Sequence, residues 1–300
     1  MKIDLVRKLS PLDRFKYWIR ERHQIYRKRQ IKQKAPWTDD EILQNYFFTN
    51  PYRENDKVTK WFRDNIRNPL KNDPRVLFAT VLFRWFNLPE TAKRLMGEGS
   101  EENLFLDWNE ENCLNRLRPL RDKGTKIFTG AYMINSPAGI PKLEAIVDRV
   151  DRAKPIVDEI ADEGPMSSME EFHKKLLQID GMGGFMAYEV VCDLRFTFYL
   201  CEAEDIMTWS NPGPGAVRGL YRVLERDFDK TTNSSSPPIP KDWAERTAEL
   251  LEECNEMLRR LQYPLFEMRE VEMSLCETDK YERLLWNEGR SKRRYNGTGN

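Results

Sequence analysis

The 300-residue sequence has few residues of the kinds that hold metals or form disulfides. It contains five cysteines, an odd number, only two histidines, and no C-x-x-C pair. This composition argues against a zinc site, an iron–sulfur cluster and a disulfide framework. We therefore expect the cysteines to be core thiols in a reducing compartment, and we expect no metal and no cofactor.

Long apolar runs are also missing. The longest, such as 76–83, are far shorter than the ~20 residues that a membrane span requires. The N-terminus lacks the apolar core of a secretory signal. We therefore expect a cytoplasmic protein with no membrane partner.

The chain carries no net charge, because 49 Lys and Arg balance 49 Asp and Glu. A neutral chain has no overall attraction to nucleic acid, so any polyanion must bind a local patch. Segment 1–34 is such a patch, with twelve basic residues against three acidic ones. Its three- and four-residue spacing predicts a helix with an aromatic face and a basic face. This basic face either contacts DNA phosphates through Arg22, Arg27 and Arg29, or is a solvated surface.

Strand-like alternation is scarce, and the only candidate is a short piece at 127–134. A capping box formed by Thr38 and Glu41 predicts a helix that begins near Asp39. Helical periodicity covers much of the remaining chain, at 56–66, 75–86, 89–95, 143–157, 168–178, 184–196, 215–225, 241–261 and 271–286. We therefore predict an all-α fold.

The predicted helices form one unit that spans 1–300. A hydrophobic fraction of 40% with 11% aromatic residues is sufficient for a packed core. The Ser- and Pro-rich stretch 230–240 is expected to be a flexible loop, and 289–300 a basic tail.

The most specific local string is LLQIDGMGGFMAYE at 176–189. An amphipathic helix runs into a glycine turn and directly into a second helix, which is typical of a helix-hairpin-helix, here placed at 168–196. Gly181, Gly183 and Gly184 allow the tight turn and bring the first N–H groups of the second helix close to a DNA phosphate. An αα-hairpin that binds no nucleic acid has the same pattern.

A second glycine-rich string, NPGPG at 211–215, opens a helix that carries Arg218. The N–H groups of Gly213 and Gly215, together with the guanidinium, suit an anion. The string is equally compatible with a stiff turn.

Asp205 stands between these two strings. The order of hairpin, acidic residue and new helix resembles the helix-hairpin-helix DNA glycosylases, in which an Asp some two dozen residues after the hairpin faces the flipped base. Phe185 occupies the position of the Schiff-base lysine of the lyase-type members, and no four-cysteine cluster follows. Base excision through an enzyme imine is therefore not expected.

Further short motifs extend the resemblance over nearly the whole chain. Besides the hairpin they are WIRER (18–22), PWTDD (36–40), FTNPYREND (48–56), LFRWFN (82–87), FTGAY (128–132), GPGAVRG (213–219) and LCETDKYER (275–283). With these motifs the sequence resembles the phage DNA base hypermodification family. Its members are called α-glutamyl/putrescinyl-thymine pyrophosphorylases or amino acid:DNA transferases, and related sequences are described as the helical domain of hydroxymethyluracil DNA kinases.

The resemblance implies a helix-hairpin-helix glycosylase-like scaffold that does not excise bases. It implies a transferase that displaces pyrophosphate from 5-(pyrophosphoryloxymethyl)uracil in double-stranded DNA with an amine or amino acid. A hydroxymethyluracil DNA kinase is a further expected partner. Loss of pyrophosphate from the carbon on ring position five leaves an electrophilic methide that an amine can trap. Such a site needs cations for pyrophosphate, a pocket for the extruded base and a proton acceptor.

Residue types assign candidates to these tasks. The proton acceptor is Asp205 or Glu189, and the base stacks on Trp209 or Tyr132. The candidates for pyrophosphate are Arg84, Lys126, Arg218, Gly213 and Gly215, and those for the DNA backbone are Gly181, Gly183, Gly184, Arg22, Arg27, Arg29, Asn50 and Arg53. Arg84 also suits a buried structural ion pair, and Trp209 and Tyr132 also suit the core.

Two other functions stay open at the level of sequence. These 300 residues contain no G-x-x-x-x-G-K-[ST] motif, so a self-contained kinase of that type is not expected. The chain is then either a transferase or a non-catalytic DNA-binding module that presents modified DNA to a kinase, with a base-excising glycosylase as the third alternative. No motif indicates which amine is transferred.

Overall fold

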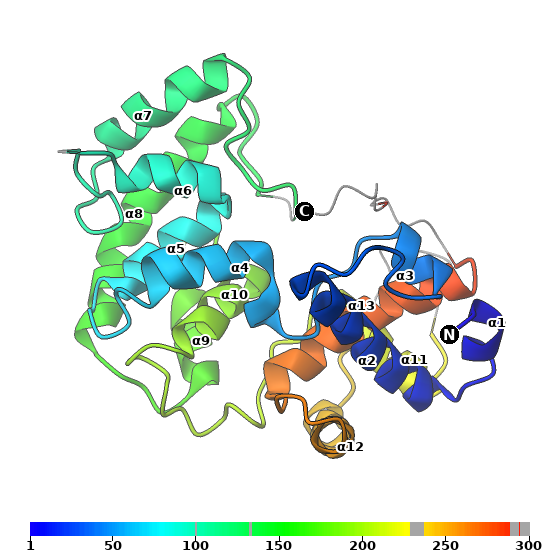
Figure 1. Cartoon of the computed structure of the whole chain (residues 1–300). Helices are drawn as coiled ribbons and strands as arrows, with labels where there is room; N and C mark the ends of the chain where they lie inside the picture. Colours follow the sequence, from blue (N-terminus) through cyan, green and yellow to red (C-terminus); the bar gives the residue numbers. More distant parts are fainter. Residues whose placement is uncertain (100, 132–133, 229–236, 289–293, 295–300) are drawn as a thin grey trace. The chain divides into compact units, whose positions relative to one another are not determined.

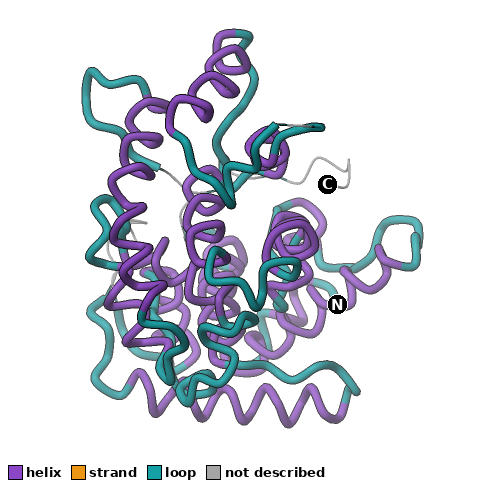
Figure 2. The backbone as a smooth tube through the Cα atoms, turned by 90° about the vertical axis from the view of Figure 1, so that its left-hand side faces the viewer, coloured by secondary structure: helices purple, strands orange, loops and turns teal. Residues whose placement is uncertain are grey.

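The computed structural model describes residues 1–99, 101–131, 134–228, 237–288 and 294. Within these residues the regular elements are all helices, and Figure 2 shows helices and loops with no strand. The prediction of an all-α fold is confirmed. The strand expected at 127–134 is not formed in its described part, and an isolated antiparallel bridge joins Tyr46 to Arg294.

Most of the predicted loop 230–240 and of the predicted tail 289–300 lies outside the described residues. No helix in the described ranges is long and apolar enough to cross a membrane.

The chain divides into two compact units. Unit 1 combines residues 1–56 with 207–300, and unit 2 consists of residues 57–206. Unit 2 is thus inserted, in sequence, between the two segments of unit 1. The single glycosylase-like unit expected from the sequence stays a prediction.

Unit 1 is built around α2, α11 and α13, which pack against one another, with α12 against α13 (Figure 1). Its helices are α1 (Ile3–Val6), α2 (Pro11–Gln30), α3 (Glu41–Asn45), the 3-10 turn η1 (Arg53–Asn55), α11 (Pro214–Val223), α12 (Trp243–Arg260) and α13 (Met268–Leu285). Ser10 caps α2 by accepting the N–H of Asp13, and Pro11 occupies the first helical position. The buried side chains of α2, including Phe15 and Trp18, belong to the core of this unit.

Unit 2 surrounds α5, whose eleven residues are all buried. Its helices are α4 (Lys57–Phe62), the π-helical turn η2 (Arg63–Arg67), α5 (Val76–Phe86), α6 (Pro89–Met96), α7 (Glu110–Asp122), α8 (Lys142–Asp162), α9 (Met169–Leu176) and α10 (Gly184–Leu194). A helix that is apolar on every side is stable only as a core helix. Accordingly, α5 packs against both α8 and α10 (Figure 1).

Local differences from the predicted helices have identifiable causes. The cap of α3 is Asp40, whose carboxylate accepts the N–H groups of Ile42 and Leu43, so the expected Thr38 cap is wrong. The Thr38 hydroxyl instead donates to Glu21. Helix α7 was not expected, because it buries only a narrow apolar stripe and contains a proline.

Candidate nucleic-acid interface

The glycine-rich string forms a helical hairpin in unit 2, as its pattern predicts. Helix α9 ends at Leu176 and α10 begins at Gly184, with Gly183 as an N-cap that supplies no side chain. Met182 is buried under the turn, whereas Gly181 and Gly183 are exposed. The hairpin therefore presents backbone at its tip, and its contact with DNA stays a prediction.

Only one turn glycine is required by the backbone. Gly181 has a φ of +75°, and an added Cβ would lie 3.1 Å from the side chain of Arg149. Gly183 has an ordinary φ of −78°, and nothing lies within 4 Å of its Cβ position. Gly181 thus shapes the turn, while Gly183 leaves the start of α10 uncovered.

Asp205, in the segment after α10, binds the N-terminal end of α9. Its carboxylate accepts hydrogen bonds from the Ser168 hydroxyl at 2.8 Å and from the N–H groups of Met169 at 2.7 Å and Glu170 at 3.0 Å. Carboxylates at a helix N-terminus are stabilising because they meet unpaired donors and the helix dipole. This geometry gives Asp205 a capping role, and its predicted role as a proton acceptor stays untested.

Arg84 and Glu189 belong to one buried ion cluster between α5 and α10. Arg84, 2% exposed, donates through Nη1 to Glu189 and through Nε to Asp193, both at 2.7 Å. The structure therefore brings a predicted pyrophosphate ligand and a predicted proton acceptor into contact. The arrangement is the structural ion pair that the sequence left open for Arg84, and removal of one partner would leave a buried charge uncompensated.

The glycine-rich start of α11 is packed against α13. A Cβ on Gly215 would lie 2.5 Å from Cys276 Sγ, and one on Gly219 would lie 2.1 Å from the carbonyl oxygen of Leu275. The N–H of Gly213 donates to the Glu272 carboxylate at 3.0 Å. A carboxylate of the chain itself thus occupies part of the predicted anion-binding terminus.

Arg218 lies in a cluster of buried charges on the same two helices. Three guanidiniums, those of Arg218, Arg222 and Arg283, donate to the carboxylate of Asp279, which has no exposed surface. Arg218 is 8% exposed and lies 3.0 Å from that carboxylate. Arg218 belongs to unit 1 and Asp205 to unit 2, so their predicted cooperation stays a prediction.

The other predicted site residues are dispersed. Asn50 and Arg53 both bind the Asp56 carboxylate and so close the loop before unit 2. Lys126 is exposed and Trp209 is half-buried. Tyr132 lies outside the described residues.

The end of α2 and the loop after it carry a basic cluster in unit 1. Its five members are Arg27, Lys28, Arg29, Lys32 and Lys34. None of them forms an ion pair with a carboxylate in the described part of the chain. The cluster therefore remains a strong local source of positive potential on a chain without net charge.

His23, on the same helix, does not add to this charge. It packs against the rings of Tyr52 and Tyr263 at centroid distances of 4.8 and 4.6 Å. Burial, reinforced by the nearby charges of Arg27 and Arg22, lowers the pKa of His23 to about 4. The imidazole is therefore neutral at physiological pH.

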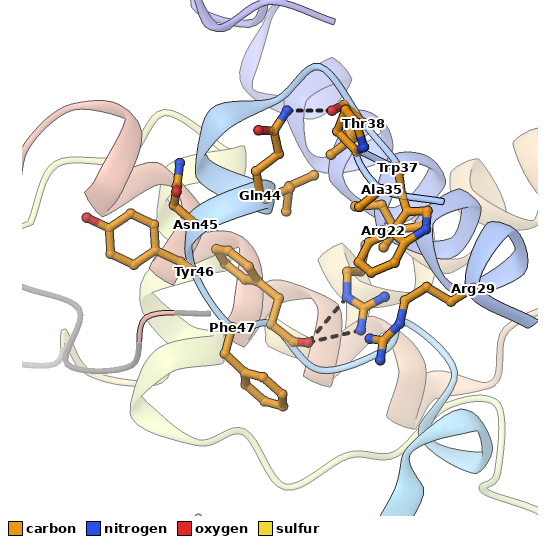
Figure 3. A pocket seen from close by; sticks show the side chains of 13 residues that line it. Arg22, Arg29, Ala35, Trp37, Thr38, Gln44, Asn45, Tyr46 and Phe47 are labelled. Atoms are coloured by element: carbon orange, nitrogen blue, oxygen red, sulfur yellow. Dashed lines mark hydrogen bonds between the residues drawn. The ribbon is translucent and has the colours of Figure 1, made fainter. Parts of the chain in front are cut away.

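A pocket of about 450 Å³ opens between α2 and the segment 35–48; we call it the Trp37 pocket (Figure 3). Arg22 and Arg29, seven residues apart on α2, both line it, and no acidic residue does. Its aromatic lining is Trp37, Tyr46, Phe47 and Phe48. The pocket thus combines positive charge with ring surfaces.

Hydrogen bonds hold the pocket walls in place. Arg22, 8% exposed, donates through Nε and Nη2 to the carbonyl oxygen of Phe48. Trp37 donates its indole N–H to the Gln33 carbonyl at 2.7 Å, and its own carbonyl accepts from Lys28 at 2.6 Å. Figure 3 shows the guanidiniums of Arg22 and Arg29 pointing into the same part of the pocket.

Sequence reasoning selected Arg22 and Arg29 but assigned them to an exposed phosphate-binding face. Arg22 is instead buried in the pocket wall, because its position on α2 faces the segment that ends in Phe48. The aromatic wall was missed, although the run Tyr46-Phe47-Phe48 so close to the loop with Trp37 was a readable signal. The described residues contain no group of three or more His, Cys, Asp or Glu side chains placed to hold a metal ion.

Comparison with known proteins identifies relatives of the chain. The family model for the helical domain of 5-hmdU DNA kinase matches residues 10–291. A 5-hmdU DNA kinase of Bacillus phage SP10 is 32% identical over 225 residues, which cover 68% of this chain and 35% of that protein. The matched region thus spans about a third of the length of the relative. No solved structure matches.

Proposed function

Because the chain belongs to the family of the 5-hmdU DNA kinase helical domain, we propose that it binds DNA containing 5-hydroxymethyldeoxyuridine or its phosphorylated forms. In this proposal the chain is the DNA-recognition module of thymidine hypermodification. The SP10 relative, a 5-hmdU DNA kinase, supports the choice of substrate. The all-helical fold with its glycine-tipped hairpin is compatible with that task.

The observation that carries the proposal is the basic cluster. Five cations gather over eight residues without a carboxylate partner in the described ranges, and their positive potential attracts a polyanion. DNA phosphates release counterions when lysine and arginine neutralise them, so such binding weakens with salt. Within unit 2, the exposed hairpin tip presents backbone of the kind that contacts DNA phosphates.

The test measures the affinity for duplex DNA, with thymine or 5-hydroxymethyluracil, at several salt concentrations by fluorescence anisotropy. The triple variant Arg27→Gln, Lys32→Gln, Lys34→Gln is expected to bind more weakly, and its slope of log K against log salt should be smaller by roughly 2 to 3, at about 0.9 per lost phosphate contact.

The matched control removes three exposed cations elsewhere in unit 1, one just before α12 and two in its last turn. It is the triple variant Lys241→Gln, Arg259→Gln, Arg260→Gln, whose charge change is the same. An unchanged slope in the first triple variant, or an equal change in the control, would contradict DNA binding through the basic cluster.

The second candidate function is the transferase implied by the sequence resemblance. The Trp37 pocket favours it, because two arginines with no acidic lining residue suit a departing pyrophosphate, and ring surfaces suit an extruded base. In the proposed step the C–O bond to pyrophosphate breaks, an amine forms the new C–N bond, and a general base takes the proton from the amine.

Incubation with pyrophosphorylated hydroxymethyluracil DNA and a panel of amines, followed by digestion and mass spectrometry of the nucleosides, separates the two functions. An amine adduct supports the transferase, unchanged nucleosides support the binding module, and abasic sites would indicate a glycosylase.

Two variants locate the chemistry if an adduct forms. Arg29→Gln is expected to slow pyrophosphate release about a hundredfold, as on the order of 3 kcal/mol is lost with one charged contact. Asp205→Asn retains an acceptor for the α9 cap, so loss of the adduct in a stably folded variant would assign a catalytic role to that carboxylate. Arg218→Ala is less informative, because it removes a buried ion pair.

A further inference from the structure

The Trp37 pocket has the dimensions and charge of a small-ligand site. Its volume of about 450 Å³ falls within the range of roughly 300–1,000 Å³ that is typical of such sites. Both charged residues in its lining are arginines. A ligand that gains from this lining is therefore anionic at one end.

The remainder of the lining selects a flat ligand. The guanidinium of Arg29 lies 5.2 Å from the ring centroid of Trp37, and Phe47 contributes a second ring to the pocket. Gln44 and Asn45 add side-chain amides, each of which already donates one hydrogen bond to a backbone carbonyl. The second N–H and the oxygen of each amide are groups of the kind that hydrogen-bond to the edges of nucleobases. Aromatic faces bind any base by stacking.

These groups are ordered before a ligand arrives. The indole of Trp37 is fixed by its bond to Gln33, Gln44 donates to the Thr38 carbonyl at 2.6 Å, and Arg22 is fixed on Phe48. Side chains that are already immobilised lose little entropy on binding. The low exposure of Arg22 also strengthens its attraction to an anion compared with an arginine in water.

We propose that the Trp37 pocket binds a single pyrimidine nucleotide, with its phosphate at Arg29 and Arg22 and its base against the aromatic wall. The choice of a pyrimidine rests on the proposed function, whereas the choice of a phosphate and a flat ring rests on the pocket. The nucleotide comes either from DNA, extruded from the duplex, or from the free pool.

Isothermal titration calorimetry of the full chain, with thymidine 5′-monophosphate, thymidine and inorganic phosphate as separate ligands, tests this proposal. The wild-type chain is expected to bind the monophosphate saturably and more tightly than either thymidine or phosphate alone. Arg29→Gln should weaken binding of the monophosphate about tenfold and leave thymidine unaffected, because it removes a charge-assisted contact. Trp37→Leu should weaken both about tenfold, because it removes a stacking surface.

The control is Arg20→Gln, which removes an arginine of the same helix that neither lines the pocket nor belongs to the basic cluster, and it should leave the monophosphate affinity unchanged. Arg29 and Trp37 are only half-buried, so their variants are expected to fold, which thermal melting checks. Phosphate binding as tight as that of the monophosphate, absence of saturable binding, or wild-type affinity in both pocket variants would overturn the proposal.

A competition arm identifies the source of the nucleotide. A duplex with a mismatched thymine should displace the monophosphate if the occupant is extruded from DNA, whereas simultaneous binding of both assigns the pocket to a free nucleotide; either result supports a nucleotide site. Intact salt-dependent DNA binding without monophosphate binding contradicts this inference alone. The reverse result contradicts only the DNA-binding proposal.

Discussion

Gly219 determines how closely two helices of unit 1 approach. Its Cα hydrogen faces the backbone of α13, where an added Cβ would lie 2.1 Å from the Leu275 oxygen and 2.6 Å from its carbonyl carbon. Backbone atoms cannot rotate away as a side chain can. Only a glycine at this position permits the observed separation of α11 and α13.

We expect Gly219→Ala to lower the free energy of unfolding by about 2 to 3 kcal/mol, because the two helices must move apart. Urea denaturation followed by circular dichroism measures this. Gly213→Ala is the matched control, since its Cβ would meet no atom closer than 3.7 Å. Equal destabilisation by both variants would show that the close approach is not the cause.

His23 predicts a dependence of stability on pH. Its pKa is about 4 in the folded chain and 6.5 in an exposed histidine, so the unfolded chain binds the proton more tightly. The stabilising contribution of His23 is therefore fully present above pH 6.5 and is lost as the pH falls toward 4, up to about 3 kcal/mol.

The measurement compares the free energy of unfolding of the wild type and of His23→Phe between pH 7 and 4. Phenylalanine keeps the ring contacts, and Nδ1 of His23 has no hydrogen-bond partner in the described part of the chain, so the substitution leaves no donor unpaired there. We expect a flatter pH profile in the variant. Parallel profiles would mean that His23 does not carry the effect.

For single residues, the sequence indicated the chemical type of a side chain better than it indicated which side chains bind it. Arg84 and Arg218 have the residue type that pyrophosphate needs, but each is held by carboxylates over a hundred and about sixty residues away, respectively. Such pairs are formed by tertiary packing and have no local pattern. The basic spacing of α2 was readable, because its periodicity lies within one helix.

The hairpin between α9 and α10 has two exposed glycines, which are expected to respond differently to substitution. Gly181→Ala should reduce stability by roughly 1 to 2 kcal/mol, because an L-residue is strained at φ +75° and its Cβ meets Arg149. Gly183→Ala should reduce stability less, by roughly 0.5 to 1 kcal/mol, because its φ of −78° suits any L-residue and the remaining cost is that alanine is a poorer N-cap than glycine.

The two variants should rank the other way in DNA affinity, which we expect Gly183→Ala to lower more than Gly181→Ala. A methyl group at the start of α10 would hinder the approach of a phosphate to the first N–H groups, and loss of such a contact lowers affinity about tenfold. Anisotropy titration of both variants, beside thermal melts, separates the two effects. Unchanged DNA affinity in Gly183→Ala would assign the hairpin to structure alone.

Most helices were predictable because their apolar spacing is regular, whereas caps and weakly patterned helices were not. The cap of α3 is Asp40 and not the expected Thr38, because the Asp40 carboxylate is also held in place by hydrogen bonds that the hydroxyls of Tyr17 and Tyr281 donate to it. Tyr281 is on α13. That tertiary contact is invisible in a local motif. Helix α7 was not predicted because the amphipathic pattern, which is the main sequence signal of a helix, is weak in it.

At the scale of the whole molecule, unit 2 is continuous in sequence and has its own core around α5. We expect a fragment of residues 57–206 to fold alone and to unfold cooperatively in a thermal melt, as domains of this size do. A fragment that lacks a cooperative transition would show that unit 2 depends on unit 1. The division into units was not readable from the sequence, since no linker-like composition marks either boundary.

The divided sequence of unit 1 has a consequence for synthesis on the ribosome. Phe15 and Trp18 pack in a core that includes residues of α13, and Arg14 of α2 pairs with Glu282 at a separation of 268 residues. Translation proceeds at about 5 to 20 residues per second, so at least about ten seconds pass between the synthesis of α2 and that of α13. During that time the aromatic side of α2 is exposed to chaperones and proteases, while the intervening segment 57–206 is already complete. The first long helix to leave the ribosome is thus among the last to be packed.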